Sequence, residues 1–217
     1  MSLNIDAARE LMIEQQLRAG SVLDQRVLDA LASVPRERFV PHDYRNLAFA
    51  DEHIPLACGQ TMMTPLQEGL VLQALSLRPM DHVLEIGTGS GYLTACLAKL
   101  AAQVTTVEVF PELADAARKR LEKMQFVNCE VVLANVFEME MHRADVIAVT
   151  GSLPMDDERF AGWLQPGGRL FQIVGDSLPM SAWRIERLAD AQYSRERLFE
   201  TALPPLLHAP TPDPFIF

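Results

Sequence analysis

The spacing of apolar residues near the start of the chain predicts two amphipathic helices. Apolar positions recur at helical spacing through residues 3–19, with charged residues between them, and Gly20 ends the pattern. A second helical pattern begins after Ser21 and stops before Pro35. Residues 35–65 show little periodicity, so the sequence predicts a long loop there. Loops of such length within a compact domain are usually functional.

From Pro65 onward, helical patterns alternate with short apolar runs. Pro65 suits the first turn of a helix that continues to about Leu77. Two more helical stretches, 91–101 and 111–124, lie between runs that are rich in β-branched residues. These runs are residues 82–87, 103–108, 129–135, 144–151 and 169–175. Because such strands are apolar throughout, the alternation predicts a parallel sheet that is covered on both faces.

Two further segments have the alternating pattern of strands but no evident helix between them. They are residues 182–188 and 195–203, and they predict an antiparallel pair at one edge of the sheet. The expected fold is therefore α/β and Rossmann-like, with seven strands of which five are parallel. We expect residues 1–217 to form one domain, in which residues 1–60 cover the carboxyl ends of the strands and residues 61–217 form the core.

The composition argues against several classes of function. The formal net charge is −10, whereas a nucleic-acid partner requires a surplus of Lys and Arg on one face. No apolar run reaches the roughly 18 residues of a membrane helix, and the N-terminus lacks the pattern of a signal peptide. The three cysteines are widely spaced without a C-x-x-C pair, which argues against disulfides and zinc. We therefore expect a cytoplasmic protein, monomeric, with no metal and no nucleic-acid or membrane partner.

A glycine-rich turn carries the strongest chemical signal in the sequence. Gly87, Gly89 and Gly91 follow a predicted strand directly and precede a helix, the context in which such glycines form a turn around a ligand. Thr88 and Ser90 lie between them, and we expect the whole turn to bind the ligand. The spacing is G-x-G-x-G rather than the G-x-G-x-x-G of a dinucleotide site, so the turn is not shaped for a pyrophosphate.

Two acidic residues indicate which ligand the turn would hold. Glu85 would repel a phosphate but suits the ammonium group of an amino-acid ligand, and Glu108 ends the second strand, where an acid can bind both hydroxyls of a ribose. A ligand that has an amino-acid ammonium group and a ribose, and that lies close to the backbone of the glycine-rich turn, fits S-adenosylmethionine. We therefore expect S-adenosylmethionine as the cofactor. The alternative is a glycine-rich turn without a ligand. Asn135, at the end of the third strand, either pairs with the adenine amino group or is a plain turn residue.

The end of the fourth strand argues against a nucleic acid as the methyl acceptor. It reads "VTGSLP" at residues 149–154. Amino methyltransferases of nucleic acids need a polar-Pro-Pro-aromatic motif there, and cytosine methyltransferases need a Pro-Cys nucleophile. The sequence has neither, in agreement with its acidic net charge.

Six segments match the order and spacing of motifs in one methyltransferase family. "RFVP" (38–41), followed about twenty residues on by "GQT" (59–61), is distinctive among methyltransferases. The six segments are "MIEQQLRAG" (12–20), "VLDALASVPRERFVP" (27–41), "LAFADEHIPLACGQT" (47–61), "VLEIGTGSGYLTACLAKL" (83–100), "LQPGGRL" (164–170) and "FETALPPLLH" (199–208). In these segments the chain resembles protein-L-isoaspartate O-methyltransferases. The resemblance implies a class I methyltransferase that uses S-adenosylmethionine to methylate the abnormal carboxylate of isoaspartyl residues in damaged proteins. That carboxylate is ionised at neutral pH and needs no general base.

Within this resemblance, the loop at residues 59–65 departs from the family pattern. The family reads G-Q-T-x-S, and its serine faces the substrate carboxylate, but this chain has Met63 at the serine position. Thr64 has a hydroxyl one position further on and is the candidate catalytic residue. The resemblance implies that the substrate contacts Gln60, Thr61, Met63, Thr64 and Thr150.

Other departures lie near the acceptor and the adenine. Leu66 replaces an aromatic residue or histidine, Ala134 and Asn135 replace a glycine-aspartate pair, and residues 150–154 replace an alanine-rich run. Methionine would give the site a soft apolar wall, or Met62 and Met63 simply pack beneath the loop. The length of the match favours an isoaspartyl methyltransferase with an altered loop. The alternatives are a protein that binds S-adenosylmethionine without this catalysis, as a sensor or partner subunit, and a methyltransferase for a small or apolar acceptor.

Overall fold

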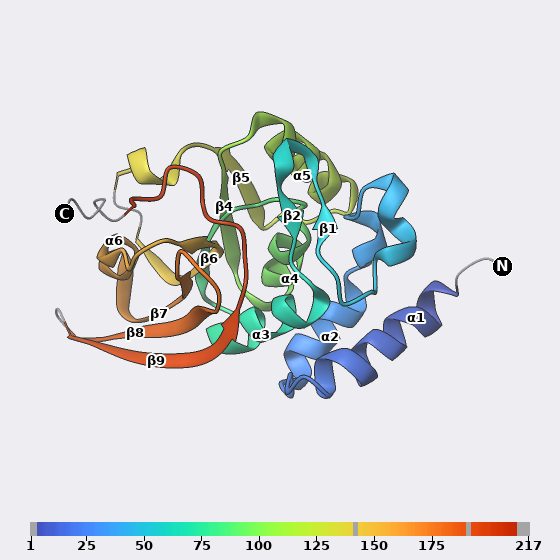
Figure 1. Cartoon of the computed structure of the whole chain (residues 1–217), viewed down its shortest axis with the longest axis horizontal. Coiled ribbons are helices and arrows are strands. Elements are labelled where there is room, and N and C mark those ends of the chain that lie inside the picture. Colours follow the sequence, from blue (N-terminus) through green and yellow to red (C-terminus); the bar gives the residue numbers. More distant parts are fainter. Residues whose placement is uncertain (1–3, 141–142, 190–191, 212–217) are drawn as a thin grey trace.

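A seven-stranded sheet with strand order β5-β4-β3-β6-β7-β8-β9 forms the centre of the molecule (Figure 1). The computed structural model describes residues 4–140, 143–189 and 192–211. Five neighbouring strands are parallel, β8 is antiparallel to β7, and β9 is antiparallel to β8. The predicted architecture and its antiparallel edge are therefore confirmed. The strands are β3 (His82–Ile86), β4 (Gln103–Glu108), β5 (Cys129–Leu133), β6 (Ala144–Leu153), β7 (Leu164–Val174), β8 (Met180–Ala189) and β9 (Gln192–Thr201).

Alternate residues of the central strands enter two separate hydrophobic cores. Val83 of β3 belongs to the larger core, which includes side chains of the N-terminal helices, whereas its neighbour Leu84 belongs to the smaller core. Val146 and Ile147 of β6 divide in the same way. This alternation is expected for a sheet with packed side chains on both faces, because successive side chains point to opposite sides.

The helices that follow the strands are α3 (Pro65–Leu75), α4 (Tyr92–Leu100), α5 (Pro111–Lys123) and α6 (Glu158–Gly162). A proline begins both α3 and α5, where its missing N–H would have no partner in any case. Between β5 and β6 the described residues form only the 3₁₀ turn η5 (Val136–Glu138). Strand β5 is consequently half-buried rather than enclosed on both faces, which corrects the prediction for residues 129–135.

The N-terminal region contains helices α1 (Ile5–Met12) and α2 (Gln25–Ser33), and α1 continues as a π-helical segment, η1 (Ile13–Arg18). The predicted start of the first helix at residue 3 lies outside the described residues. The predicted loop at 35–65 contains short elements instead: η2 (Arg36–Arg38), η3 (His42–Leu47), η4 (Ala57–Gly59) and a hairpin of β1 (Ile54–Pro55) with β2 (Thr61–Met62).

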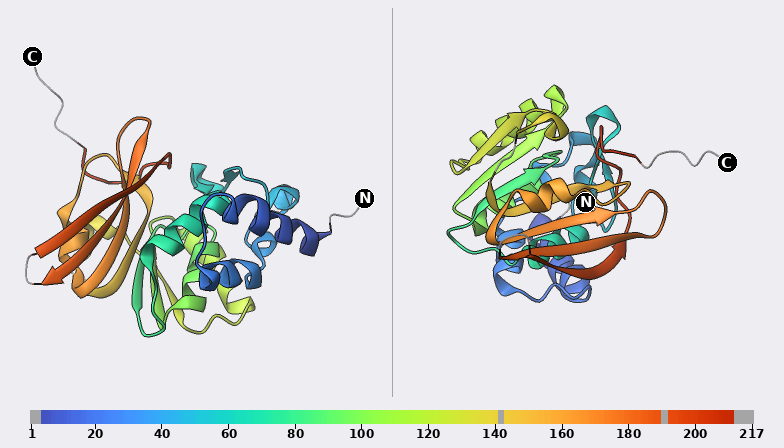
Figure 2. Two further views of the ribbon diagram at one scale, coloured as in Figure 1. Left: turned by 90° about the horizontal axis from the view of Figure 1, so that it is seen from below. Right: turned by 90° about the vertical axis from the view of Figure 1, so that its left-hand side faces the viewer.

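These N-terminal helices do not themselves cover the strand ends. Helix α2 contacts α3 and α4, and η1 contacts α3. They lie at the opposite end of the molecule from β8 and β9 (Figures 1 and 2). Residues 1–60 were expected to lie over the carboxyl ends of the strands, but mainly the segment around the β1–β2 hairpin does so. In the part of the chain that the structure describes, none of the helices is long and apolar enough to cross a membrane.

Candidate active site

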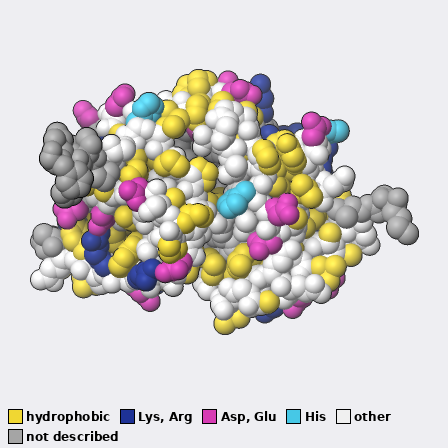
Figure 3. Space-filling model, in the orientation of Figure 1, with side chains coloured by type: hydrophobic (Ala, Val, Ile, Leu, Met, Phe, Trp, Pro, Cys, Tyr) yellow, Lys and Arg dark blue, Asp and Glu magenta, His cyan; other side chains and the backbone are white. Residues whose placement is uncertain are grey.

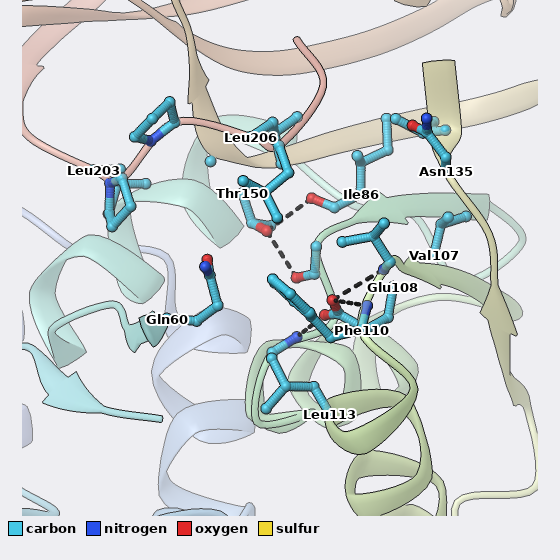
Figure 4. Close-up of a pocket in the computed structure, with 18 of the residues that line it drawn as sticks. Gln60, Ile86, Val107, Glu108, Phe110, Leu113, Asn135, Thr150, Leu203 and Leu206 are labelled. Carbon is cyan, nitrogen blue, oxygen red and sulfur yellow. Dashed lines mark hydrogen bonds between the residues drawn. The ribbon is translucent and has the colours of Figure 1, made fainter. Parts of the chain in front are cut away.

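A cleft at the carboxyl ends of β3, β4 and β6 brings together most of the residues that the sequence singled out. It contains about 750 Å³ of empty space, part of it open to solvent. In Figure 4, Gln60 and Leu203 face Glu108 and Asn135 across this cleft. The predicted site residues in its lining are Gln60, Thr61, Met63, Gly87, Gly89, Glu108, Asn135 and Thr150.

The glycine-rich turn needs its first glycine because another strand approaches it closely. Gly87 has φ +100°, and a Cβ atom there would lie 2.4 Å from Thr150 Oγ1. The Thr150 hydroxyl lies 2.8 Å from the carbonyl oxygens of both Ile86 and Gly87, to which it donates. A side chain at position 87 would collide with this contact and would require a strained backbone. Thr150 therefore supports the turn from the end of β6, and its hydroxyl is already engaged.

Glu108 is buried at the end of β4, and the backbone holds its carboxylate in place. Its Oε2 accepts a hydrogen bond from Gly89 N at 2.9 Å, and its Oε1 accepts from Val109 N and Phe110 N, both at 3.0 Å. Hydrogen bonds to an ionised acceptor are the strong ones. An ionised carboxyl has about four lone-pair positions, so three such bonds leave it room for a ligand hydroxyl. The contact fixes the glycine-rich turn relative to the start of α5.

Glu85 lies beneath the turn and is fully buried. Its Oε2 accepts a hydrogen bond from the Thr94 hydroxyl, but its Oε1 has no partner among the described residues. It lines a small pocket beside the cleft that Met63 and Gly87 also line. Burial raises the pKa of the Glu85 carboxyl to about 7, and the nearby hydroxyls of Thr94 and Thr106 oppose the rise. A cation that reached this oxygen would relieve an unfavourable burial.

The other predicted cofactor residues have structural contacts. The hydroxyl oxygens of Thr88 and Thr106 lie 2.6 Å apart, and Ser90 Oγ accepts from Tyr92 N at 3.2 Å. Gly91 has φ +84° and packs against Ala117, where a Cβ would come within 3.1 Å of the Ala117 Cβ. These three residues shape the turn from below, and none of them lines the main cleft.

Asn135 lines the cleft, but its side chain is engaged locally. Its Oδ1 accepts from Phe137 N at 3.1 Å, and its Nδ2 donates to Glu138 Oε1 at 2.9 Å. This is the geometry of an Asx turn that begins η5. The contacts favour the interpretation of Asn135 as a turn residue over a role in adenine recognition.

The two methionines of the loop have different surroundings. Met63 is 8% exposed and lines both the cleft and the small pocket beside it, whereas Met62 lines only the small pocket. Gln60 and Thr61 lie beside Met63 in the cleft lining. Of the two methionines, Met63 is the one that walls the main cleft.

Thr64, the candidate catalytic residue, does not line the cleft. It is the N-cap of α3: its Oγ1 accepts from Gln67 N at 3.3 Å, while Gln67 Oε1 accepts from Thr64 N at 3.0 Å. Such a capping box satisfies two helix N–H groups that would otherwise lack partners. This geometry favours a structural role for Thr64 over the catalytic and substrate-binding roles expected of it.

One wall of the cleft was missed by the sequence reasoning. Residues 203–207, which follow β9, line the acceptor side of the cleft. They are held against the end of β6, since Ser152 N donates to Pro204 O and Leu206 N donates to Ser152 O, both at 2.9 Å. The Gln67 side chain also donates to Thr201 Oγ1 and to Ala202 O. The apolar "LPPLL" run within the segment at 199–208 was the available signal.

The residues present fit S-adenosylmethionine. Glu108 offers a fixed carboxylate, Glu85 has an oxygen without a described partner, and Gly87 keeps the backbone free of a side chain at the turn. Ile86, Val107 and Phe110 provide apolar surface beside Glu108. Within the described ranges, no three His, Cys, Asp or Glu side chains are grouped so that they could hold a metal ion.

Comparison with known proteins agrees with this geometry. A solved structure from Plasmodium falciparum, described as a protein-L-isoaspartate O-methyltransferase in complex with S-adenosyl-L-homocysteine, superposes with a TM-score of 0.81 at 20% identity. The match covers 94% of this chain and 99% of that one. The fold is thus that of the class I methyltransferases, and the cleft fits their cofactor, S-adenosylmethionine.

The sequence relatives identify the family. Residues 7–209 match the model of the protein-L-isoaspartate(D-aspartate) O-methyltransferase family, and the chain belongs to this family. It is 40% identical to the protein-L-isoaspartate O-methyltransferase of Rhodopseudomonas palustris, over 91% of this chain and 92% of that protein. It is 41% identical to the enzyme of that name from Picosynechococcus, over 78% of this chain and 77% of the relative.

The helix cap at Thr64 can be separated from catalysis by substitution. Thr64→Ala should lower the free energy of unfolding by about 1 kcal/mol, because Gln67 N loses its acceptor. Thr64→Ser keeps the hydroxyl and should restore the stability. Neither change should alter kcat/KM by more than about twofold. Denaturant unfolding measures the stability, and methyl-transfer kinetics measure kcat/KM. Loss of turnover at unchanged stability would show that Thr64 takes part in catalysis.

Proposed function

We propose that this protein transfers a methyl group from S-adenosylmethionine to the carboxylate of isoaspartyl residues in damaged proteins. The observation that carries the proposal is the cleft itself. It sets Gln60 and Thr61 of the acceptor loop opposite the buried Glu108, in a chain that belongs to the isoaspartyl methyltransferase family. Alignment of a carboxylate with a methyl group across such a cleft is the main task of the protein.

Each side of the cleft has a separate role in this proposal. Glu108 would bind the ribose, and Glu85 would receive the ammonium group through its Oε1. Bound S-adenosylmethionine supplies an electrophilic methyl group on a sulfonium, and the ionised acceptor carboxylate is the nucleophile. Gln60 and Thr61 are the neutral hydrogen-bond donors nearest in sequence to Met63 in the cleft lining, and they would orient that carboxylate.

The surface of the protein is compatible with a protein substrate. On the face seen in Figure 3, hydrophobic side chains lie among acidic ones, and Lys and Arg do not dominate it. We propose that the chain acts as a single domain, as a monomer in the cytoplasm, on damaged proteins or peptides rather than on nucleic acids. The net charge of −10 supports the last point, since phosphate binding needs excess positive charge.

A methyl-transfer assay with three samples tests the proposal directly. The isoaspartyl form of a peptide should accept methyl groups, whereas the aspartyl form of the same peptide and a sample without peptide should not. Equal incorporation with both peptides, or none with either, would contradict the proposed acceptor.

One observation favours the alternative of a less polar acceptor. Among the described residues that line the cleft there is no Lys, Arg or His, and Met63 and Leu206 contribute apolar surface to it. An acceptor carboxylate would have to be bound by neutral donors alone. A small or apolar acceptor is therefore the second candidate, and the assay above separates the two.

Removal of the Glu108 carboxylate should weaken cofactor binding. Glu108→Ala should lower the affinity for S-adenosylhomocysteine by about 1.5–3 kcal/mol, because a charge-assisted contact is lost. Isothermal calorimetry measures the effect. Glu112→Ala is a matched control, since Glu112 is an exposed acid of α5 outside the cleft lining. Equal affinities of the Glu108 variant and the wild type would show that Glu108 does not bind the ribose.

Cofactor binding should release a proton at slightly acidic pH. Burial raises the pKa of Glu85 to about 7, and the nearby Glu108 and Glu68 contribute to the rise. Below that pH the free protein carries a neutral Glu85, whereas an ammonium favours the ionised form, so binding weakens as the pH falls. At pH 6, calorimetry in two buffers with different ionisation enthalpies should detect the release of about one proton per site. Glu85→Gln should abolish most of this release; an unchanged value would assign the proton to another group.

Restoring a hydroxyl at position 63 should improve the use of an isoaspartyl peptide. Met63→Ser should raise kcat/KM by roughly tenfold to a hundredfold, because a charge-assisted hydrogen bond to the carboxylate is worth about 1.5–3 kcal/mol. We expect the gain mainly in KM, since the new donor also binds the ground-state carboxylate. Met62→Ser is the control for lost packing, because Met62 is also buried, at 4% exposed, but lies outside the main cleft.

If Met63→Ser binds the cofactor normally but still shows no turnover of the isoaspartyl peptide, the acceptor has been misassigned. A gain of similar size in the Met62 variant would instead indicate a general loosening of the loop.

A further inference from the structure

Arg36 is a buried arginine outside the cleft, and its guanidinium has four hydrogen bonds. Its Nε donates to Glu68 Oε2 at 3.0 Å, and its Nη2 donates to Glu68 Oε1 at 3.3 Å. Its Nη1 donates to Ala48 O at 2.8 Å, and Nη2 also donates to Met63 O at 2.6 Å. The Arg36 and Glu68 side chains are 1% and 3% exposed. An arginine stays charged even when buried, so Glu68 provides the balancing charge.

The two carbonyl groups that Arg36 binds, those of Ala48 and Met63, lie at the two ends of one loop segment. Ala48 precedes the β1–β2 hairpin and Met63 follows it, so one guanidinium holds both ends of the segment 48–63. That segment carries Gln60 and Thr61, which line the cleft. Glu68 lies in α3, immediately after the loop, and thereby fixes the guanidinium to the core of the protein.

The same guanidinium also contacts the cofactor side. Its central carbon lies 5.3 Å from the centroid of the Tyr92 ring, within the range of a cation–π contact. Tyr92 is fully buried and directly follows Gly91, the last glycine of the turn. Phe39 also packs edge-on against the Tyr92 ring, with the ring centroids 5.6 Å apart. One side chain therefore touches the acceptor segment and the residue that begins α4.

We propose that Arg36 and Glu68 are positioning residues, which hold the acceptor segment 48–63 at a fixed distance from the cofactor turn. This inference rests on the proposed methyl transfer for its effect on turnover. Methyl transfer depends on the alignment of nucleophile, methyl group and sulfur, and a displacement of about 1 Å can reduce the rate by a factor on the order of a hundred. Loosening this cluster should therefore affect the acceptor more than the cofactor.

A second buried ion pair provides the matched comparison. Arg169 pairs with Asp81, and both side chains are buried. Arg169 Nε donates to Leu75 O at 2.7 Å, and its Nη2 donates to Ser76 O at 3.1 Å. Asp81 precedes β3, so this pair lies at the amino ends of the strands, away from the cleft. Its chemistry resembles that of the Arg36 cluster, but it touches neither the hairpin nor the turn.

The test compares Glu68→Gln with Asp81→Asn in three measurements. Both variants should have a lower Tm, because each leaves a buried arginine without its counter-charge. Only Glu68→Gln should accelerate amide hydrogen exchange in residues 48–63. With an isoaspartyl peptide, only Glu68→Gln should lower kcat/KM, by about tenfold or more, while its Kd for S-adenosylhomocysteine stays within about threefold of wild type.

The positioning role of Arg36 and Glu68 and the proposed methyl transfer can fail independently. Equal exchange in residues 48–63 of both variants, or equal losses of kcat/KM, would overturn the positioning role. A wild-type protein without turnover of the isoaspartyl peptide would overturn the proposed function, whereas the exchange measurement would still decide whether the cluster holds the hairpin. If Glu68→Gln does not fold, Glu68→Asp keeps the charge but withdraws it by one methylene, and the same selective effects should follow in weaker form.

Discussion

The burial of three carboxyl groups beside the cleft is the constraint on which the site depends. An ionised carboxylate loses several kcal/mol on leaving water unless partners compensate for the loss. Glu108 accepts hydrogen bonds from three backbone N–H groups and Glu68 pairs with the Arg36 cation, whereas Glu85 faces the neutral hydroxyls of Thr94 and Thr106. The first arrangement fixes the cofactor side and the second fixes the acceptor side. The third leaves Glu85 Oε1 without a described partner, and either a proton or an arriving cation would relieve its burial, which is why this residue points to a binding function.

The sheet and its helices could be predicted because their signals are local. Apolar runs such as 103–108 and prolines such as Pro65 and Pro111 mark strands and helix starts within a few residues. The hairpin of β1 and β2 could not be predicted, because each strand is only 2 residues long. The two strands pair with each other in a separate two-stranded sheet. The position of the N-terminal helices depends on their contacts with α3 and α4, and amphipathic spacing does not specify which partner an apolar face will find.

The site was predicted where a residue's role follows from its place on the fold, and missed where a long-range contact decides it. Glu108 ends its strand at the cleft, as its position required. Thr64 forms a helix cap that the sequence reasoning did not identify, because a hydroxyl near a substrate loop has the same appearance in sequence as a helix cap, although Gln67 three residues on completes the signature of a capping box. Glu68 was overlooked because its partner Arg36 is 32 residues away. An acid within the apolar helix "PLQEGLVLQAL" was the available hint that a buried cation lies nearby.

The apolar walls of the acceptor side are compatible with the chemistry proposed for it. A carboxylate and a sulfonium become a neutral ester and a neutral thioether, so charge disappears along the reaction. Strong pairing of the carboxylate with Lys or Arg would stabilise the reactants more than the transition state and would slow the step. In the proposed reaction Gln60 and Thr61 would orient the carboxylate without neutralising it, and Met63 and Leu206 would present apolar surface to it. A lining whose described residues include no Lys, Arg or His would therefore weaken the binding of an acceptor carboxylate while it favours the transfer, and Met63 would weaken that binding further.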